Sequence, residues 1–179
     1  MIEVRWHGRG GQGGFTAARL LGMAAALFEG RFALAFPSFG PERRGAPVLG
    51  FTRIDDRKIT DRSAVRECDY VVVLDETLMN PAIADGLKPG GKVIVNSATP
   101  SKYANGGFEV IGLDATGLAT ETLGKPITNT AMLGALIAVS SMVRLDSAVR
   151  AIEQEMNPKL AQANIQLVKR AFASLQSKP

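Results

Sequence analysis

The feature that most constrains the fold is a glycine-rich stretch, GRGGQG, at residues 8–13. It follows an alternating, β-prone segment over Ile2–Trp6. It precedes Phe15–Phe28, where small apolar residues recur at helical spacing. Its glycines match the pattern G-x-G-x-x-G between a strand and a helix. Glycines let backbone N–H groups approach a ligand, and the amino end of a helix carries partial positive charge. The stretch therefore predicts a phosphate-binding loop after the first strand.

The same pattern also occurs as a tight turn that only packs a helix against a sheet. Binding of a nicotinamide dinucleotide calls for an acidic residue about 20 positions after the loop, at the end of the second strand. Here that strand ends Ala35-Phe36-Pro37-Ser38, and Glu29 precedes it. No Gly-Lys-Ser/Thr and no Gly-x-Ser-x-Gly motif is present. The sequence therefore favours an anion site without indicating that dinucleotide.

The rest of the chain alternates between strand and helix patterns. Further strands are expected over Arg31–Phe36, Val48–Ile54, Tyr70–Leu74, Lys92–Val95 and Phe108–Leu113. Helices are expected over Leu78–Leu87, Ala131–Val143, Ser147–Met156 and Pro158–Leu175, and a hairpin turn over Asp55–Lys58 leading into Ile59. This alternation predicts one domain over residues 1–179. Its fold class is α/β: a three-layer, Rossmann-like fold with a mainly parallel sheet.

Composition excludes several classes of function. Lys and Arg outnumber Asp and Glu by only 21 to 17, which does not call for a nucleic-acid partner. Cys68 is the single cysteine, whereas an iron–sulfur cluster needs about four thiolates. Cys68 is expected in the core and His7, the single histidine, at a strand end. No apolar run is long enough for a membrane span and no signal segment precedes Ile2, so we expect a cytoplasmic protein without metal ligands.

Charged residues suggest two further features. Basic residues gather between Arg43 and Arg62, which favours an anionic ligand or an acidic partner, or else a solvated basic surface. Asp75 and Glu76 follow a strand, where capping of the next helix is favoured over a place in the crevice. No set of nucleophile, base and orienting residue is evident, so no catalytic residue is assigned. The chain is predicted to bind rather than to catalyse alone.

Four stretches together resemble the gamma subunit, or gamma domain, of pyruvate and other 2-oxoacid:ferredoxin oxidoreductases. They are GRGGQG, AARLLGMAAALFEG, FPSFGPERRGAPVLGFTRIDDRKI and NTAMLGA, and the likeness extends from Met1 to about Lys169. The resemblance implies a complex that converts a 2-oxoacid, coenzyme A and oxidised ferredoxin into acyl-CoA, carbon dioxide and reduced ferredoxin. It implies that alpha and beta subunits hold thiamine diphosphate, and that beta and delta subunits hold iron–sulfur clusters. The absence of cluster cysteines and of a Gly-Asp-Gly motif agrees with a gamma role.

The stretch PSFGPERRGAP is similar to the pyruvate type, which leaves branched-chain, indolepyruvate and oxalate relatives as alternatives. The resemblance implies coenzyme A handling and assembly of the complex as the role of this chain. The residues assigned to coenzyme A are Gly8, Gly10, Gly11, Gln12, Gly13, Arg43, Arg44, Asn129 and Thr130. For the two arginines, a carboxylate of the alpha subunit is an equally good partner. For the last two residues, plain helix capping is the alternative.

Two other functions stay open from the residues alone. One is a stand-alone nucleotide-binding dehydrogenase, and the other is a structural interaction module whose glycine loop only packs. A gamma chain is expected to cover Phe36, Phe39, Pro41 and Pro47 with its partners. When isolated, it is expected to be able to form a homodimer through the same residues.

Overall fold

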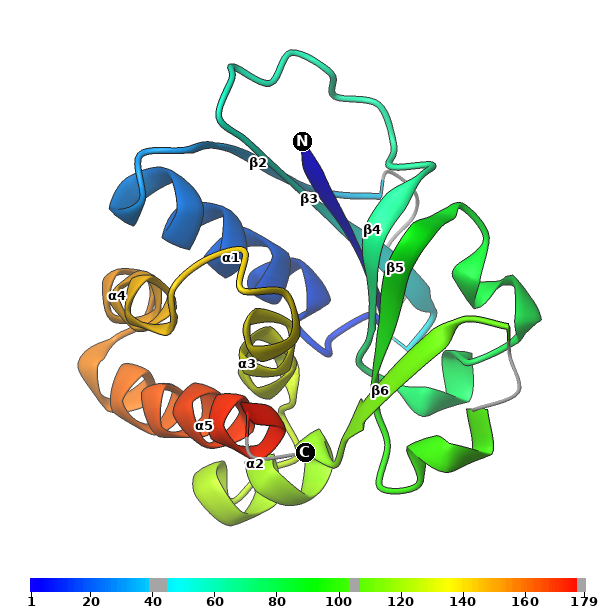
Figure 1. Cartoon of the computed structure of the whole chain (residues 1–179). Coiled ribbons are helices and arrows are strands. Elements are labelled where there is room, and N and C mark those ends of the chain that lie inside the picture. The colour runs from blue at the N-terminus through cyan, green and yellow to red at the C-terminus, as the bar shows by residue number, and fades with distance from the viewer. Residues whose placement is uncertain (39–44, 104–106, 177–179) are drawn as a thin grey trace.

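The computed structural model describes residues 1–38, 45–103 and 107–176 (Figure 1). Within them, one six-stranded sheet has the strand order β2-β3-β1-β4-β5-β6. The strands are β1 (Ile2–Arg9), β2 (Phe32–Pro37), β3 (Pro47–Asp55), β4 (Cys68–Val73), β5 (Leu87–Asn96) and β6 (Glu109–Leu113). The α-helices are α1 (Gly14–Phe28), α2 (Ala115–Leu123), α3 (Asn129–Ser140), α4 (Leu145–Glu155) and α5 (Pro158–Gln176). Short 3₁₀ helices are η1 (Glu76–Leu78), η2 (Pro81–Ala84) and η3 (Pro100–Tyr103).

The direction of the crossovers reverses in the middle of the sheet. β1, β4, β5 and β6 run parallel, whereas β3 is antiparallel to both β1 and β2. α1 leads from β1 toward β2, and the connections β4–β5 and β5–β6 move the opposite way. Because crossovers between parallel strands are right-handed, the two sets lie on opposite faces, as Figure 1 shows. The carboxyl ends of β1 and β4 are therefore a topological switch point, where open α/β sheets bind ligands.

α1 packs on the sheet through small residues that face each other. A Cβ atom at Gly22 would meet Ala35 at 3.5 Å, and one at Gly50 would meet the side chain of Ala18 at 3.6 Å. The indole of Trp6 is fully buried on this face and donates to the Thr52 hydroxyl at 3.1 Å. Thr52 in turn donates to the Ala18 carbonyl at 2.9 Å. The small-residue face predicted for this helix is confirmed.

α3 is the central helix of the α-helical layer. Its residues from Asn129 to Ile137 are all buried, which matches its nearly uniform apolar sequence. A Cβ atom at Gly134 would lie 2.5 Å from the Val168 carbonyl oxygen of α5. Gly134 therefore sets how closely α3 and α5 approach. No described helix is both long and apolar enough to cross a bilayer.

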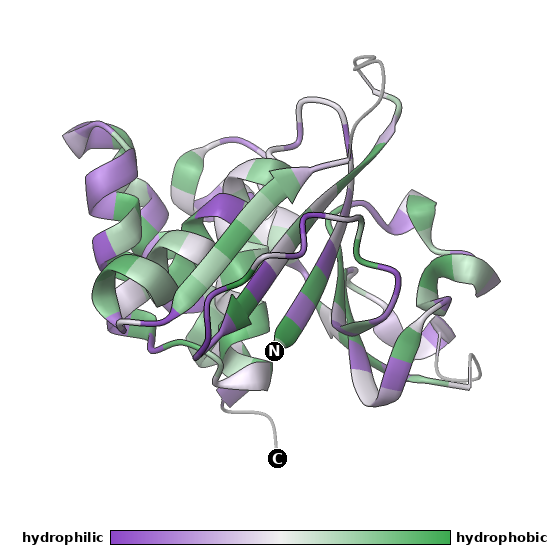
Figure 2. Cartoon of the chain, turned by 90° about the horizontal axis from the view of Figure 1, so that it is seen from above, coloured by the Kyte–Doolittle hydropathy of each residue, from purple (hydrophilic) through white to green (hydrophobic). Residues whose placement is uncertain are grey.

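The opposite face carries a more polar layer. β1 alternates hydrophobic and hydrophilic residues, visible as its banding beside the N-terminus in Figure 2. Val4 and Trp6 join the helical core, whereas Arg5 is buried on the other face. Arg5 donates to His7 Nε2 at 3.0 Å and to the carbonyls of Ile83 and Asp85. The α/β class and the mainly parallel sheet are confirmed, and this second layer consists of 3₁₀ helices and irregular segments.

The helix predicted over Leu78–Leu87 is wrong. Pro81 disfavours helical backbone at Asn80, which is extended with φ −153° and ψ 168°. The Asn80 side chain instead accepts from Ala82 N and starts η2. Gly86 then takes a positive φ of 75°, and Leu87 begins β5. Pro81 and Gly86 thus prevent a continuous helix in an apolar stretch that has helical spacing.

Two other local predictions also differ from the structure. No strand follows Asp55 within residues 56–67, so the predicted hairpin into Ile59 is wrong. The buried Arg53 guanidinium donates to the carbonyls of Asp61 and Ser63, which draws the segment onto the sheet instead. α2 was not predicted, although Asp114 caps it by accepting from Gly117 N at 2.8 Å. Its short, weakly apolar sequence carries little periodic signal.

Candidate functional site

The glycine loop joins β1 to α1 with the backbone conformations that its glycines permit. Gly11 has φ 94° and Gly13 has φ 76°, both in the region that favours glycine. A Cβ atom at Gly13 would also lie 2.6 Å from Asn129 Nδ2. The start of α1 is therefore packed directly against the start of α3. Gly8 is buried inside β1 and lies behind the loop rather than at its open side.

Only part of the loop backbone is free to bind an anion. Gly10 N donates to the Ala46 carbonyl at 2.9 Å, and Gln12 N donates to the Arg9 carbonyl at 3.0 Å. These two predicted phosphate donors are committed within the chain. The N–H groups of Gly11 and Gly13 have no partner among the described residues. Because Gly13 is the N-cap and has no side chain, the first amides of α1 also lack a cap.

The Gln12 side chain holds the loop in place. Its Oε1 accepts from Arg9 N at 2.7 Å, and its Nε2 donates to Asp75 Oδ2 at 3.0 Å. The sequence prediction gave this amide to a phosphate, whereas the structure uses both of its ends to fasten the loop to β1 and to the end of β4. Gln12 still lines the pocket described below.

Arg9 and Asp75 extend this connection and were not predicted as site residues. Arg9 Nε lies 3.0 Å from Asp75 Oδ2, and the same guanidinium donates to Thr77 Oγ1 and to the Gly45 carbonyl. Burial alone would raise the pKa of Asp75. Hydrogen bonds from Thr77 and Gln12 and the charge of Arg9 outweigh it and hold that pKa below its usual value. Asp75 also caps η1, as the sequence favoured.

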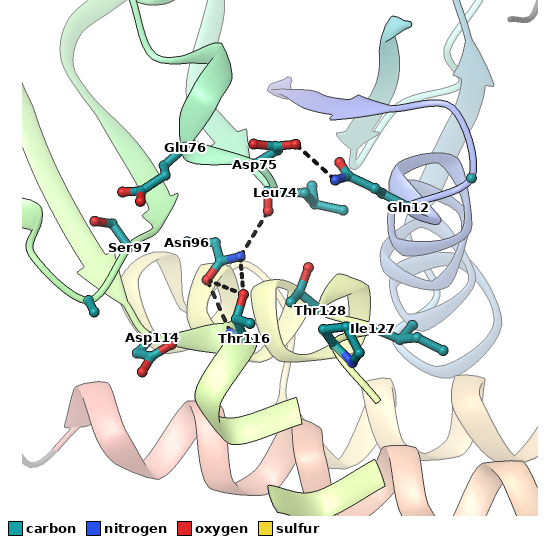
Figure 3. A pocket seen from close by; sticks show the side chains of 13 residues that line it. Gln12, Leu74, Asp75, Glu76, Asn96, Ser97, Asp114, Thr116, Ile127 and Thr128 are labelled. Atoms are coloured by element: carbon teal, nitrogen blue, oxygen red, sulfur yellow. Dashed lines mark hydrogen bonds between the residues drawn. The ribbon is translucent and has the colours of Figure 1, made fainter. Parts of the chain in front are cut away.

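A pocket of about 550 Å³ opens at the carboxyl ends of β1, β4, β5 and β6 (Figure 3). Asn96 organises its floor by donating to the Leu74 carbonyl at 2.9 Å and to Thr116 Oγ1 at 3.0 Å. The lining residues are Gly11, Gln12, Leu74, Asp75, Glu76, Asn96, Ser97, Ala98, Asp114, Thr116, Pro126, Ile127 and Thr128. Asn96 and Asp114 directly follow predicted strands, so polar residues at strand ends were the signal that could have found them.

The electrostatics of the pocket combine helix amino ends with paired carboxylates. α1, α2 and α3 all begin at this pocket, and α1 and α3 have no side-chain cap on their N-cap residues. Asp75 is paired with Arg9. Glu76 accepts from Lys102 Nζ at 2.8 Å, and that hydrogen bond lowers the pKa of Glu76. Two of the lining carboxylates are thereby neutralised, and Asp114 is engaged by the start of α2.

The remaining predicted site residues are placed differently. Asn129 lies against Gly13, and its Oδ1 accepts from Thr130 N at 3.0 Å. Thr130 is fully buried and donates its hydroxyl to Asn164 of α5 at 2.7 Å, so this hydroxyl serves the helical core rather than the pocket. Capping and packing, the alternatives considered for this pair, describe both side chains.

The two arginines assigned to coenzyme A, Arg43 and Arg44, lie outside the described residues, as do Phe39 and Pro41. Gly45, the residue after Arg44, donates its N–H to the Gly10 carbonyl at 3.2 Å. The described basic residues of that sequence cluster, Arg53, Arg57, Lys58 and Arg62, do not line the pocket. Arg53 is buried beneath the sheet, and β3 carries the chain from the loop to the opposite end of β1 before Arg57 and Lys58.

Cys68 lies in the core as expected, whereas His7, expected at a strand end, lies inside β1, two residues before its last residue. Cys68 is fully buried, and burial raises the pKa of its thiol. His7 lies in β1, where burial, assisted by the charge of Arg5, lowers its pKa to about 4. Across residues 1–38, 45–103 and 107–176, no three His, Cys, Asp or Glu side chains are grouped for a metal ion.

Fold and pocket define an α/β domain with a crevice at its topological switch point. The family model described as pyruvate ferredoxin/flavodoxin oxidoreductase matches residues 3–174. The chain is 46% identical over 179 residues to pyruvate synthase subunit PorC of Methanocaldococcus jannaschii, covering 99% of each chain. It is 46% identical to the pyruvate/ketoisovalerate oxidoreductases common subunit gamma of Thermococcus kodakarensis, covering 96% of each. The crystal structure of pyruvate oxidoreductase subunit PORC from Thermotoga maritima superposes with a TM-score of 0.85 at 38% identity, covering 96% of this chain and 95% of that one.

This chain therefore belongs to the pyruvate ferredoxin/flavodoxin oxidoreductase family, as a gamma subunit of the oxidoreductase complex. The resemblance carried by the four sequence stretches is confirmed. Other subunits of that complex are its partners. The stand-alone dehydrogenase is not supported, and the arrangement of the sheet gives the reason. In a dinucleotide-binding fold, the parallel strand next to β1 carries the ribose-binding acid at its carboxyl end. Here the strand next to β1 on that side is β3, which is antiparallel, so no such carboxyl end lies beside the glycine loop.

Proposed function

We propose that this gamma subunit binds the phosphate groups of coenzyme A for a complex that oxidatively decarboxylates pyruvate. It does so as one domain over residues 1–179, in the cytoplasm. Alpha and beta subunits hold thiamine diphosphate, which supplies the carbanion chemistry. Beta and delta subunits hold the iron–sulfur clusters that pass electrons to ferredoxin. The names of the relatives, which include pyruvate, support this substrate, and a branched 2-oxoacid is the alternative.

One observation carries the coenzyme A proposal: α1 and α3 begin at the same pocket, and the N-cap residue of each helix, Gly13 and Thr128, makes no side-chain cap hydrogen bond. Gly11 lines the pocket, and the free N–H groups of Gly11 and Gly13, together with the uncapped first amides of α1, place positive partial charge beside it. The start of α3, at Thr128 and Asn129, adds a second amino end. A pyrophosphate is the kind of group that such an arrangement binds.

The rest of the pocket lining suits an uncharged part of the ligand. Ser97 is polar, Asn96 and Thr116 form a mutually hydrogen-bonded polar floor, and Leu74 and Ile127 offer apolar contact on the side of Gln12 (Figure 3). Such a mixed lining is compatible with the amides and methyl groups of the pantetheine arm. A volume of about 550 Å³ falls within the range of small-molecule sites. Arg43 and Arg44 remain part of the proposal, since Gly45 joins their segment to the glycine loop.

A pair of variants at Gly11 tests the charge of this site. A Cβ atom at Gly11 meets nothing within 4 Å, and Asn and Asp both tolerate a positive φ. Gly11→Asp and Gly11→Asn therefore differ in charge alone. Isothermal titration of the assembled complex with coenzyme A should show about tenfold weaker binding for the aspartate, or about 1.4 kcal/mol. Equal affinities in the two variants would contradict binding of a phosphate group in this pocket and would favour a loop that only packs.

A further inference from the structure

A second surface lies on the face of the sheet away from α1, at its β2 edge. Phe32, Leu34 and Phe36 project from alternate positions of β2 on this face, since Phe36 stacks on Phe51 at 5.2 Å in the opposite core. Phe36 is half-buried, whereas Phe32 is 47% exposed. Ala33 and Ala35 face α1 instead. The row therefore changes from half-buried to exposed toward the end where β2 begins.

Cations without partners flank the exposed end of this row. Phe32 pairs with Asp55 across the strands, so residues 56–63 leave β3 beside it. Arg53 holds that segment against the sheet through the carbonyls of Asp61 and Ser63. The side chains of Arg57, Lys58 and Arg62 are exposed and have no hydrogen bond or ion pair among the described residues.

The nearby carboxylates are already used within the chain. Asp56 pairs with Arg31 at 2.9 Å, and Asp61 pairs with Arg53 at 3.3 Å. Asp55 lies 3.2 Å from the α-amino group and accepts from Arg57 N. The surface formed by Phe32, Leu34, Arg57, Lys58 and Arg62, here called the β2 corner, thus carries uncompensated positive charge around an exposed aromatic ring.

The open edge of β2 itself offers little backbone pairing. Ser38 N donates to the Leu49 carbonyl, so Ser38 faces β3 and Pro37 faces outward. Pro37 has no N–H, which leaves outward donors only at Ala33 and Ala35 of this strand. Addition of a partner strand is therefore restricted, and recognition falls to the side chains of the corner.

We propose that the β2 corner is a docking surface for an acidic region of another subunit of the oxidoreductase complex. The partner presents carboxylates around an apolar contact: Phe32 is the anchor, and the three cations form the rim. A second copy of this chain is a poor occupant, because its corner brings the same positive charges and no free carboxylate of residues 55–63. This surface lies at the opposite end of β1 from the coenzyme A pocket and does not depend on that proposal.

Assembly of the complex from the gamma chain and its companion subunits tests the corner. We compare R57E/K58E and Phe32→Ser with matched controls on α5, Lys159→Glu and Leu160→Ser; Lys159 is exposed and Leu160 is 55% exposed. At about 50 mM salt, both corner variants should raise the dissociation constant of assembly about tenfold or more, and the controls should leave it within about twofold. Added salt should reduce the difference in dissociation constant between wild type and R57E/K58E, but not the difference between wild type and Phe32→Ser.

Unfolding midpoints of each purified variant separate loss of docking from loss of fold. Unchanged midpoints with weakened assembly support the corner. Normal assembly of both corner variants overturns the proposal, and so does selective loss of a gamma–gamma dimer, because that result would identify the occupant as a second copy. Coenzyme A affinity of complexes that do assemble should stay unchanged.

Discussion

The guanidinium of Arg9 and the carboxylate of Asp75, 66 residues apart, meet at 3.0 Å and join the glycine loop to the end of β4. Gln12 and Thr77 donate to the same carboxylate, and Gly45 accepts from the same guanidinium. One ion pair thus positions the loop, the start of η1 and the chain that follows the arginine segment. The conformation of the glycine loop at the pocket therefore depends on the contacts of Arg9 and Gln12 with Asp75.

Asp75→Asn should destabilise the protein by about 1 kcal/mol, because it removes the charge from a partly buried, hydrogen-bonded pair. Urea unfolding at pH 7 measures this. Asp56→Asn is the control, since Asp56 is 84% exposed in its pair with Arg31 and its loss should cost close to nothing. If both variants lower the free energy of unfolding by the same amount, the Arg9–Asp75 pair contributes no more to stability than an exposed surface pair.

The same carboxyl predicts an acid-dependent contribution to stability. Its pKa is lower in the folded chain than in the unfolded chain, so the unfolded state binds more protons as the pH falls through that window. The contribution is complete above the unfolded value, near 4, and is lost as the pH falls through the lower folded value. The stability difference between wild type and Asp75→Asn should therefore narrow below about pH 4 in unfolding measured by circular dichroism.

His7 should titrate far below an ordinary histidine. Its folded pKa is about 4 against an unfolded value of 6.5, so the unfolded state binds more protons between these values. Stability should be complete above pH 6.5 and should fall by roughly 3 kcal/mol as the pH approaches 4. Because His7 is the single histidine, one ring resonance in a proton NMR titration reports it. A midpoint near 6.5 would contradict a half-buried ring that stays neutral in the folded chain.

Gly13→Ala should destabilise the protein by about 2–4 kcal/mol, since it combines backbone strain with a contact of 2.6 Å to Asn129. Gly90→Ala isolates the strain: Gly90 has φ 79° and nothing within 4 Å of its Cβ position. It should cost about 1 kcal/mol. Chemical unfolding compares the two variants, and equal costs would mean that Asn129 simply moves aside.

Gly134→Ala tests the spacing of α3 and α5. An alanine normally stabilises a helix interior by about 1 kcal/mol over glycine. Here the 2.5 Å approach to the Val168 carbonyl outweighs that gain, and we expect a net loss of about 1–3 kcal/mol. Gly22→Ala in α1 is the matched control, because its Cβ would meet Ala35 at an ordinary 3.5 Å, and it should be neutral or stabilising. Thermal unfolding of both variants decides the sign.

Short-range patterns allowed much of the fold to be predicted. The strand–glycine loop–helix unit, five further strands, α3, α4 and α5 were expected within five residues of their bounds, because periodicity and caps act within one element. The false helix at Leu78–Leu87 and the missed α2 arose in short segments where single residues, Pro81 and Asp114, decide the backbone. The family was indicated by the resemblance of four sequence stretches to known gamma subunits.

By itself the sequence determined a glycine loop that takes positive φ between a strand and a helix, and the family to which that loop belongs. Only the tertiary structure decided which loop amides stay free. The acceptor for Gly10 is Ala46, and the group that fastens Gln12 is Asp75, 63 residues away. The physical reason is that φ preferences are local properties of each residue, whereas a hydrogen-bond partner is supplied by whichever strand the sheet places alongside.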